Sequence, residues 1–238
     1  MNYLAFDIET AKITESGDNL NADRPLGICC YALAWLDGNG SVQTYTGHGR
    51  DNDGKPTRQM RREECAELVQ NLLRQSYVTD STLLTHNGSG FDLDILAEES
   101  GMHAECVDLA MNSVDTMLHF LCMKGFPVGL DAIAKGMGLS GKTEGMSGQL
   151  APVLWAEGRY EEVLAYVKQD AISTLKTALR VEQIGEVRWI AKSGRLNAMP
   201  LSKWVTAREA LTLPLPDTSW MTNPMPRSKF IAWMAKTA

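Results

Sequence analysis

The chain has 238 residues, of which 44% are hydrophobic and 22% are charged, and its formal net charge is −6 at pH 7. This composition is typical of a folded globular protein and excludes a disordered chain or a membrane protein. No apolar run approaches the roughly 18 residues that a membrane-spanning helix needs, and the N-terminus lacks the basic start of a signal peptide. We therefore expect no membrane association.

The first part of the chain predicts three strands, of which the second and third form a hairpin. Residues 2–9 alternate between apolar and other side chains, which is typical of a strand with two different faces. Residues 27–36 are almost continuously apolar and predict a buried strand. The sequence Asp37-Gly-Asn-Gly40 is a strong hairpin signal, so residues 41–45 should return antiparallel. The polar, Gly-rich residues 48–57 predict a loop.

Helices and one more strand follow. Residues 81–86 predict a short strand, which the Gly-rich residues 87–90 follow as a loop. Apolar spacing of three and four predicts helices at residues 58–77, 91–100, 114–123, 130–137, 149–157 and 159–184. This order predicts an α/β fold, a mixed sheet flanked by helices in residues 1–185. Ligand sites in such sheets lie at the carboxyl ends of strands.

The regular pattern ends after Gly185. Residues 186–238 contain four tryptophans and five prolines, and we expect a mostly irregular extension packed on the same domain, with a short helix near residues 229–234. They also contain eight Lys or Arg and three Asp or Glu, so their net charge is +5 and that of residues 1–185 is −11. Tryptophan with Lys and Arg suits contacts to a single strand of nucleic acid. The alternative, which we favour, is that the tryptophans seal the edge of the core.

Cysteine usage indicates a reducing compartment. The chain has five cysteines, an odd number, and their spacing is not that of a metal site. Cys29 and Cys30 are adjacent within an apolar run, which is typical of buried free thiols. We therefore expect free cysteines and a cytoplasmic location.

Three short motifs contain carboxylates. Asp7 and Glu9 are two apart on a predicted strand, so both point to one face and repel each other unless a cation lies between them. Mg²⁺ and Mn²⁺ prefer such oxygen ligands. Asp92 opens a predicted helix, and Tyr166 and Asp170, four apart on another, share a face. Taken alone, each motif is better explained by a structural role: Asp7 and Glu9 as a solvent-exposed strand end, Asp92 as a helix start, and Tyr166 with Asp170 as a surface pair.

Together the motifs form a specific signal. They resemble the three motifs of the DEDD superfamily of 3′–5′ exonucleases in its tyrosine branch, and the similarity extends to stand-alone relatives of the proofreading domain of family-B DNA polymerases. Phe6-Asp7-Ile8-Glu9-Thr10 is similar to the first motif, Asn87-Gly-Ser-Gly-Phe91-Asp92 to the second, and Tyr166-Val-Lys-Gln-Asp170 to the third. The resemblance covers residues 1–184 and implies an RNase H-like fold.

The resemblance also implies a mechanism. Two Mg²⁺ or Mn²⁺ ions would be bound by four carboxylates, those of Asp7, Glu9, Asp92 and Asp170. Tyr166 would orient the attacking water, because a phenol with a pKa of about 10 is a poor base at neutral pH. The products would be nucleoside 5′-monophosphates.

Four residues are candidates for substrate binding: Thr10, Asn87, Phe91 and Lys142. For Phe91 core packing is the preferred alternative, and for Lys142 a solvated side chain is equally compatible with the sequence. Asp115 resembles an acid that lies between the second and third motifs of polymerase exonuclease domains, and we expect a supporting role. His86, at a strand end, is expected to be structural.

We therefore expect a 3′–5′ exonuclease that acts on nucleic acid with a free 3′ end, with single-stranded DNA favoured by the polymerase-like first motif. An exoribonuclease is the first alternative, because a two-metal site cleaves either backbone and discrimination depends on the 2′-hydroxyl. A non-catalytic nucleic-acid-binding module is the second, although all four carboxylates and the tyrosine are present. The acidic net charge argues against a large electrostatic contact with nucleic acid. No protein partner is identifiable.

Overall fold

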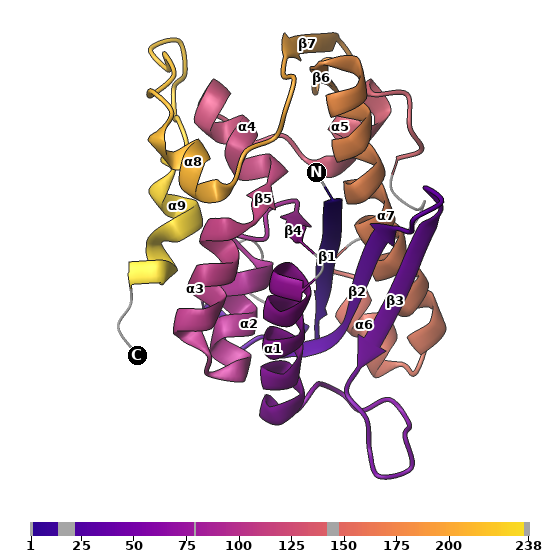
Figure 1. Cartoon of the computed structure of the whole chain (residues 1–238). Coiled ribbons are helices and arrows are strands. Elements are labelled where there is room, and N and C mark those ends of the chain that lie inside the picture. The colour runs from indigo at the N-terminus through magenta and orange to yellow at the C-terminus, as the bar shows by residue number, and fades with distance from the viewer. Residues whose placement is uncertain (1, 14–21, 79, 142–147, 236–238) are drawn as a thin grey trace.

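The computed structural model describes residues 2–13, 22–78, 80–141 and 148–235. Its centre is a five-stranded sheet with the order β3-β2-β1-β4-β5 (Figure 1). The strands are β1 (Asn2–Thr10), β2 (Ile28–Leu36), β3 (Val42–His48), β4 (Ser81–Thr85) and β5 (Val114–Asp115). β1 pairs antiparallel with β2 and parallel with β4, so the sheet is mixed. The predicted fold class is confirmed.

The alternation along β1 gives the sheet two buried faces. Tyr3 and Ala5 belong to one apolar cluster, and Leu4, Phe6 and Ile8 belong to another. Both faces of a central strand need cover, and here helices supply it on each side. The same alternation places Asp7 and Glu9 on the face of Tyr3 and Ala5, at the carboxyl end of the strand.

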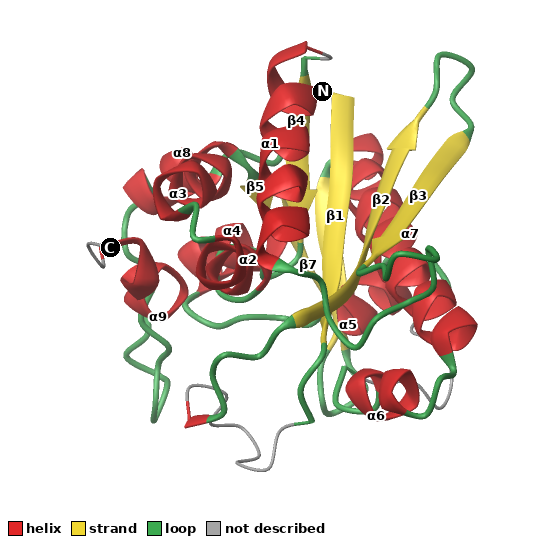
Figure 2. Ribbon diagram, turned by 90° about the horizontal axis from the view of Figure 1, so that it is seen from below, coloured by secondary structure: helices red, strands yellow, loops and turns green. Residues whose placement is uncertain are grey.

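Seven helices are distributed over the two faces (Figure 2). They are α1 (Arg62–Val78), α2 (Asp92–Ser100), α3 (His103–Asn112), α4 (Thr116–Lys124), α5 (Leu130–Gly136), α6 (Ala151–Ala156) and α7 (Tyr160–Ile184). The 25-residue α7 packs against β1 and β2, and its buried residues Val163, Val167 and Leu175 join the cluster of Tyr3. α1, α2 and α3 cover the opposite face and contribute Leu68, Leu96 and Leu109 to the other cluster.

The structure adds two elements that the sequence pattern did not indicate within residues 102–124. Helix α3 occupies residues 103–112, and residues 114–115, predicted as the start of a helix, form the short strand β5 beside β4. Only Cys106, Leu109 and Ala110 of α3 are fully buried, so its apolar periodicity is weak. β5 consists of two residues, which is too short for a period-two pattern.

The residues directly after Gly185 have more secondary structure than the sequence pattern predicted. β6 (Glu186–Ile190) and β7 (Leu196–Pro200) form an antiparallel hairpin, and α8 (Ala207–Thr212) begins at a capping box made by Thr206 and Glu209. The expected final helix is present as α9 (Ser228–Ile231), continued by the 3₁₀ helix η2 (Ala232–Ala235). The residues between α8 and α9 have no regular secondary structure, as predicted.

Three of the four C-terminal tryptophans are core residues. Trp189 and Trp204 belong to the cluster under α7, and Trp233 belongs to the cluster under α1 and α2. The favoured interpretation, that these side chains seal the core, is confirmed for all three. Trp220 is different, because 68% of it is exposed.

Two further expectations concern the whole chain. All five cysteines are free and buried, as predicted. Within the described part of the chain, no helix has both the length and the apolar character needed to cross a bilayer.

Candidate functional site

Three carboxylates from two elements meet at the carboxyl end of β1. Single oxygen atoms of Asp7, Glu9 and Asp170 all lie within 4.8 Å of one another. Glu9 and Asp170 are buried, with 6% and 7% of their surface exposed, and Asp7 is half-buried. Such a buried group of carboxylates fits a hard divalent cation, because oxygen is the ligand that Mg²⁺ and Mn²⁺ prefer.

The negative charges of these three carboxylates repel one another. Burial raises the pKa of Glu9 well above its ordinary value, and the charges of Asp7 and Asp170 add to the rise. Both causes disfavour the ionised form, since a charge loses hydration and meets neighbours of the same sign. A bound cation would reverse this local balance.

Asp92 lies beside the group and is joined to β1. It is the first residue of α2, and its Oδ1 accepts a hydrogen bond of 3.1 Å from the backbone N–H of Ile8, which lies between Asp7 and Glu9 in β1. Burial raises the pKa of Asp92 to about 7, and the charges of Asp115 and Asp170 contribute to this rise. Asp92 is not among the three residues whose oxygen atoms meet within 4.8 Å, so its role as a metal ligand remains a prediction.

Tyr166 is a buried residue of α7, the helix that packs against β1. It lies one helical turn before Asp170, its hydroxyl is hydrogen-bonded to Asp170, and only 2% of the residue is exposed. Burial and the charges of Asp170 and Glu9 raise its pKa far above the usual value. The phenol therefore stays protonated at physiological pH and is available as a hydrogen-bonding group.

The loop before Asp92 is fixed by Asp115. The side chain of Asp115 accepts hydrogen bonds from the backbone N–H groups of Asn87 at 3.0 Å and Ser89 at 2.8 Å, and it also caps α4. The supporting role expected for Asp115 is therefore an anchoring one. In the sequence, the signal for this anchoring role is an Asp directly before a helix, in Val-Asp-Thr, because Asp is a preferred N-cap residue.

The predicted substrate residues have different surroundings. Thr10 is buried at the end of β1, next to an irregularity in the pairing with β2. Asn87 has a positive φ of 78°, a conformation that Asn tolerates better than most residues, so a structural role accounts for its presence. Phe91 is half-buried and packs against the core, in line with the preferred alternative. Lys142 lies outside the described residues.

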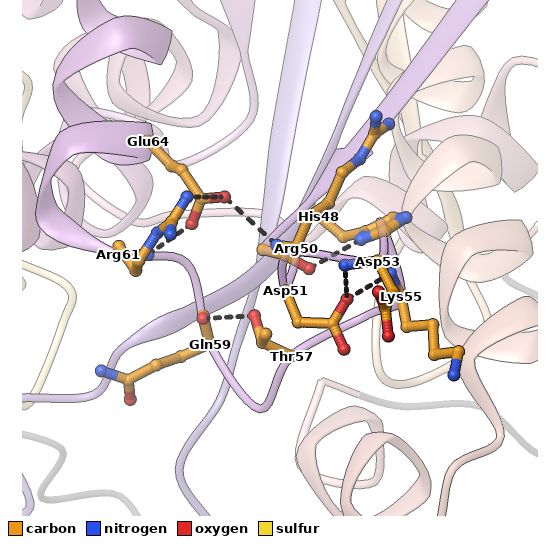
Figure 3. A network of polar contacts seen from close by, with 10 residues as sticks. His48, Arg50, Asp51, Asp53, Lys55, Thr57, Gln59, Arg61 and Glu64 are labelled. Carbon is orange, nitrogen blue, oxygen red and sulfur yellow. Dashed lines mark hydrogen bonds and ion pairs between the residues drawn. The ribbon is translucent and has the colours of Figure 1, made fainter.

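A polar loop begins next to the carboxylates. Glu9 pairs with Cys30, and Cys30 pairs on its other side with His48, the last residue of β3. The loop that follows is ordered by Asp51, whose Oδ1 accepts from the backbone N–H groups of Asp53 and Lys55 (Figure 3). The indole of Trp155 donates to the carbonyl of Thr57 and ties the loop to α6. The loop thus lies at this end of the sheet, and it has exposed cations at positions 50, 55 and 58.

The comparison with protein families identifies the fold. The family model of the RNase H superfamily matches residues 4–180, about three quarters of the chain. The chain belongs to the RNase H superfamily. A search of curated proteins found no match. The residues matched include all four carboxylates and Tyr166, and membership of this superfamily indicates a metal-dependent nuclease acting on nucleic acid.

A cleft of about 620 Å³ lies elsewhere in this RNase H-like domain. It is lined by the start of β1, including Asn2 and Leu4, by Tyr31 and Trp35 of β2, and by residues of α1. Asp7 and Glu9 are at the other end of β1 and do not line it. This cleft is therefore separate from the carboxylate site.

Proposed function

We propose that the protein is a 3′–5′ exonuclease that hydrolyses DNA, with a single strand as the favoured substrate, and releases nucleoside 5′-monophosphates. The observation that carries the proposal is the meeting of Asp7, Glu9 and Asp170 within 4.8 Å beside the buried hydroxyl of Tyr166. Three converging carboxylates alone would fit any site for a hard divalent cation. The tyrosine one turn before Asp170 supports the tyrosine branch of 3′–5′ exonucleases.

The carboxylates would hold the cofactor. Asp7, Glu9 and Asp170 offer converging oxygens, and Asp92, held against β1 through Ile8, offers its second oxygen from the side of α2. Two Mg²⁺ or Mn²⁺ ions, when bound, supply the positive charge that activates water and stabilises the leaving 3′ oxygen. The hydrogen bond from the backbone N–H of Ile8 fixes the orientation of the Asp92 carboxylate before any cofactor binds.

Tyr166 would position the nucleophile. Its hydroxyl is hydrogen-bonded to Asp170, so it is held at the edge of the carboxylate group. A neutral phenol both donates and accepts hydrogen bonds, which suits the orientation of a water molecule for in-line attack. Because its pKa is raised, proton removal must fall to another acceptor, such as a carboxylate.

The choice of DNA over RNA depends on the similarity of the first motif to polymerase proofreading domains. A 3′–5′ exoribonuclease is the alternative activity, and a nucleic-acid-binding module without catalysis is the alternative of another class. The presence of all five side chains favours catalysis over binding alone.

The proposal is tested with 5′-labelled single-stranded DNA and RNA oligonucleotides in Mg²⁺, Mn²⁺ or EDTA. We expect a metal-dependent ladder that shortens from the 3′ end, stronger with DNA and absent in Asp7→Ala. Glu161→Ala is the matched control, because Glu161 is an exposed acid in the first turn of α7. A stronger RNA ladder would favour the exoribonuclease, and binding without cleavage in either metal would favour the binding module.

A further inference from the structure

The C-terminal end of the chain contacts the loop that leads into Asp92. The indole Nε1 of Trp233 in η2 donates a hydrogen bond of 2.7 Å to the backbone carbonyl of Ser89, 144 residues earlier. Trp233 is 5% exposed and packs within the cluster that contains Ile8 and Leu93. A buried hydrogen bond of this length is costly to lose, since the carbonyl would then lack a partner away from water.

Further contacts fix the tryptophan. The Nε2 of His103, at the start of α3, lies 3.0 Å from the carbonyl oxygen of Trp233, and the two rings meet edge to face at 5.7 Å. Phe230 lies on Gly90, where an added Cβ would come within 2.9 Å of its ring. Glycine at this position therefore permits the close approach of α9 to the loop.

Arg227 anchors the segment before α9. Its guanidinium donates to four backbone carbonyls, and three of these belong to the end of α8 and the residues directly after it, Leu211, Leu213 and Pro214. The fourth is the carbonyl of Cys122, near the end of α4, at 2.9 Å. Arginine has five donors in a fixed plane, so one side chain can join several carbonyl groups. The position of Trp233 is thus set from the body of the protein and not by η2 alone.

The loop is held from both sides. Asp115 binds the backbone N–H of Ser89, and Trp233 binds its carbonyl. The residue before α2 is Phe91, whose side chain has no hydrogen-bonding atom to cap the helix. The backbone N–H of Leu93 donates instead to the carbonyl of Gly88, so the start of α2 is tied to the loop that Asp115 and Trp233 hold. Asp92 is the first residue of that helix.

We propose that Trp233 is a positioning residue for the site: its indole N–H holds the Ser89 carbonyl and thereby fixes the start of α2 and the carboxylate of Asp92. This inference rests on the proposed function. It assigns the C-terminal extension a role in assembling the site, in addition to covering the core.

The test compares Trp233→Phe, which keeps a ring and removes the N–H donor, with Trp220→Phe. Trp220 is the matched control, because its indole also donates to a backbone carbonyl, that of Asp217, but the side chain is exposed. Hydrogen–deuterium exchange of the metal-free proteins is measured for residues 86–92 and for β1 and α7. Mn²⁺ affinity is measured by paramagnetic resonance, and kcat and KM are measured on the DNA oligonucleotide.

For Trp233→Phe we expect exchange of residues 86–92 to rise roughly two- to tenfold, the factor that one buried hydrogen bond represents. Exchange in β1 and α7 should stay unchanged, Mn²⁺ should bind more weakly, and kcat should fall more than KM rises. His103→Ala, which leaves the indole donor in place, should change the same quantities in the same direction by less. Trp220→Phe should match the wild type.

Two results would overturn the inference. One is unchanged loop exchange and Mn²⁺ affinity in Trp233→Phe. The other is an equal rise of exchange in all segments, which would mean a general loss of stability. Failure of the proposed function is distinguishable: a wild-type protein that cleaves neither oligonucleotide, with faster loop exchange and weaker Mn²⁺ binding in Trp233→Phe, would reject the exonuclease and retain the positioning role.

Discussion

At the scale of single residues, the site concentrates negative charge where burial makes it costly. Glu9, Asp92 and Asp170 are each less than 8% exposed, and Asp7 lies beside them. Buried carboxylates without a cation between them destabilise the fold, because each loses hydration and repels its neighbours. In the metal-free protein these carboxylates therefore lower the stability of the fold.

Removing one of these charges should stabilise the metal-free protein. We expect Glu9→Gln to raise the free energy of unfolding in EDTA, since the raised pKa of Glu9 means that folding disfavours its ionised form and glutamine has no such form. The same variant should lose most of the stabilisation that Mn²⁺ gives the wild type. Thermal unfolding with and without Mn²⁺ measures both quantities, with Glu161→Gln as control. A lower melting temperature for Glu9→Gln in EDTA would contradict the argument.

Loss of the Tyr166 hydroxyl should affect turnover and not metal binding. We expect Tyr166→Phe to lower kcat by roughly ten- to a hundredfold, the scale of a group that orients a reactant. Mn²⁺ affinity and KM should change little, because the carboxylates remain. Tyr160→Phe is the control, since Tyr160 lies on the same helix and packs on Trp155 at 4.7 Å between ring centres. A variant that loses Mn²⁺ binding would instead assign Tyr166 a role in holding the carboxylates.

At the scale of elements, α4 connects the site to the C-terminal extension. Its N-terminus is capped by Asp115, which also holds the loop before Asp92. In the middle of α4 lies His119, which is 3% exposed. Its ring packs edge-on against that of Trp204, with 5.5 Å between the ring centres. The Nδ1 of His119 accepts a hydrogen bond of 3.4 Å from the backbone N–H of Val205, just before α8. That acceptor exists only while the ring is neutral.

His119 should make the stability of the fold depend on pH. Burial lowers its pKa to about 4, below the ordinary value of 6.5. Between these two values the unfolded chain binds a proton that the folded chain does not, so stability falls as the pH falls from about 6.5 to about 4. His119→Asn keeps an acceptor and removes the titration. Denaturant unfolding at several pH values should show a shallower decline in this variant, by on the order of 2 kcal/mol at pH 4. Parallel curves for the two proteins would reject this role.

At the scale of the whole molecule, charge is separated along the chain. Residues 1–185, which contain the site, have a net charge of −11, and residues 186–238 have +5. An extended nucleic-acid-binding surface would need many more cations near the site. The exposed cations in the loop after β3 are few, and Asp51 and Asp53 lie among them. This distribution of charge agrees with the proposal that the protein binds only a short stretch of single-stranded nucleic acid near its 3′ end.

The salt dependence of binding should therefore be shallow. We expect a plot of log Kd against log salt for single-stranded DNA to have a slope of about 2–3, which corresponds to roughly three or four phosphate contacts at about 0.7 each. Fluorescence anisotropy with Ca²⁺ in place of Mg²⁺ measures the slope without rapid turnover. A slope above about 5 would indicate an extended track of phosphate contacts.

The sequence by itself predicted the strands β1 to β4, the long helices α1 and α7, and the three carboxylates that meet at the end of β1. The alternation of β1 placed Asp7 and Glu9 on one face, and the spacing of Tyr166 and Asp170 placed them on one side of α7. These predictions succeeded because the periods of strand and helix are local properties of the backbone. Helix α3 and strand β5 were missed because their few buried residues leave little periodicity.

Only the tertiary structure decided how the parts of the site are held. The bond from Ile8 to Asp92, the anchoring of Ser89 by Asp115 and the bond from Trp233 to Ser89 join residues 84, 26 and 144 positions apart. No local period links such residues, since these contacts form only when the sheet, α2, α4 and η2 pack together. A backbone carbonyl such as that of Ser89 also has no side-chain signature. The sequence therefore predicts which carboxylates form the site, and the packing of distant elements determines how they are positioned.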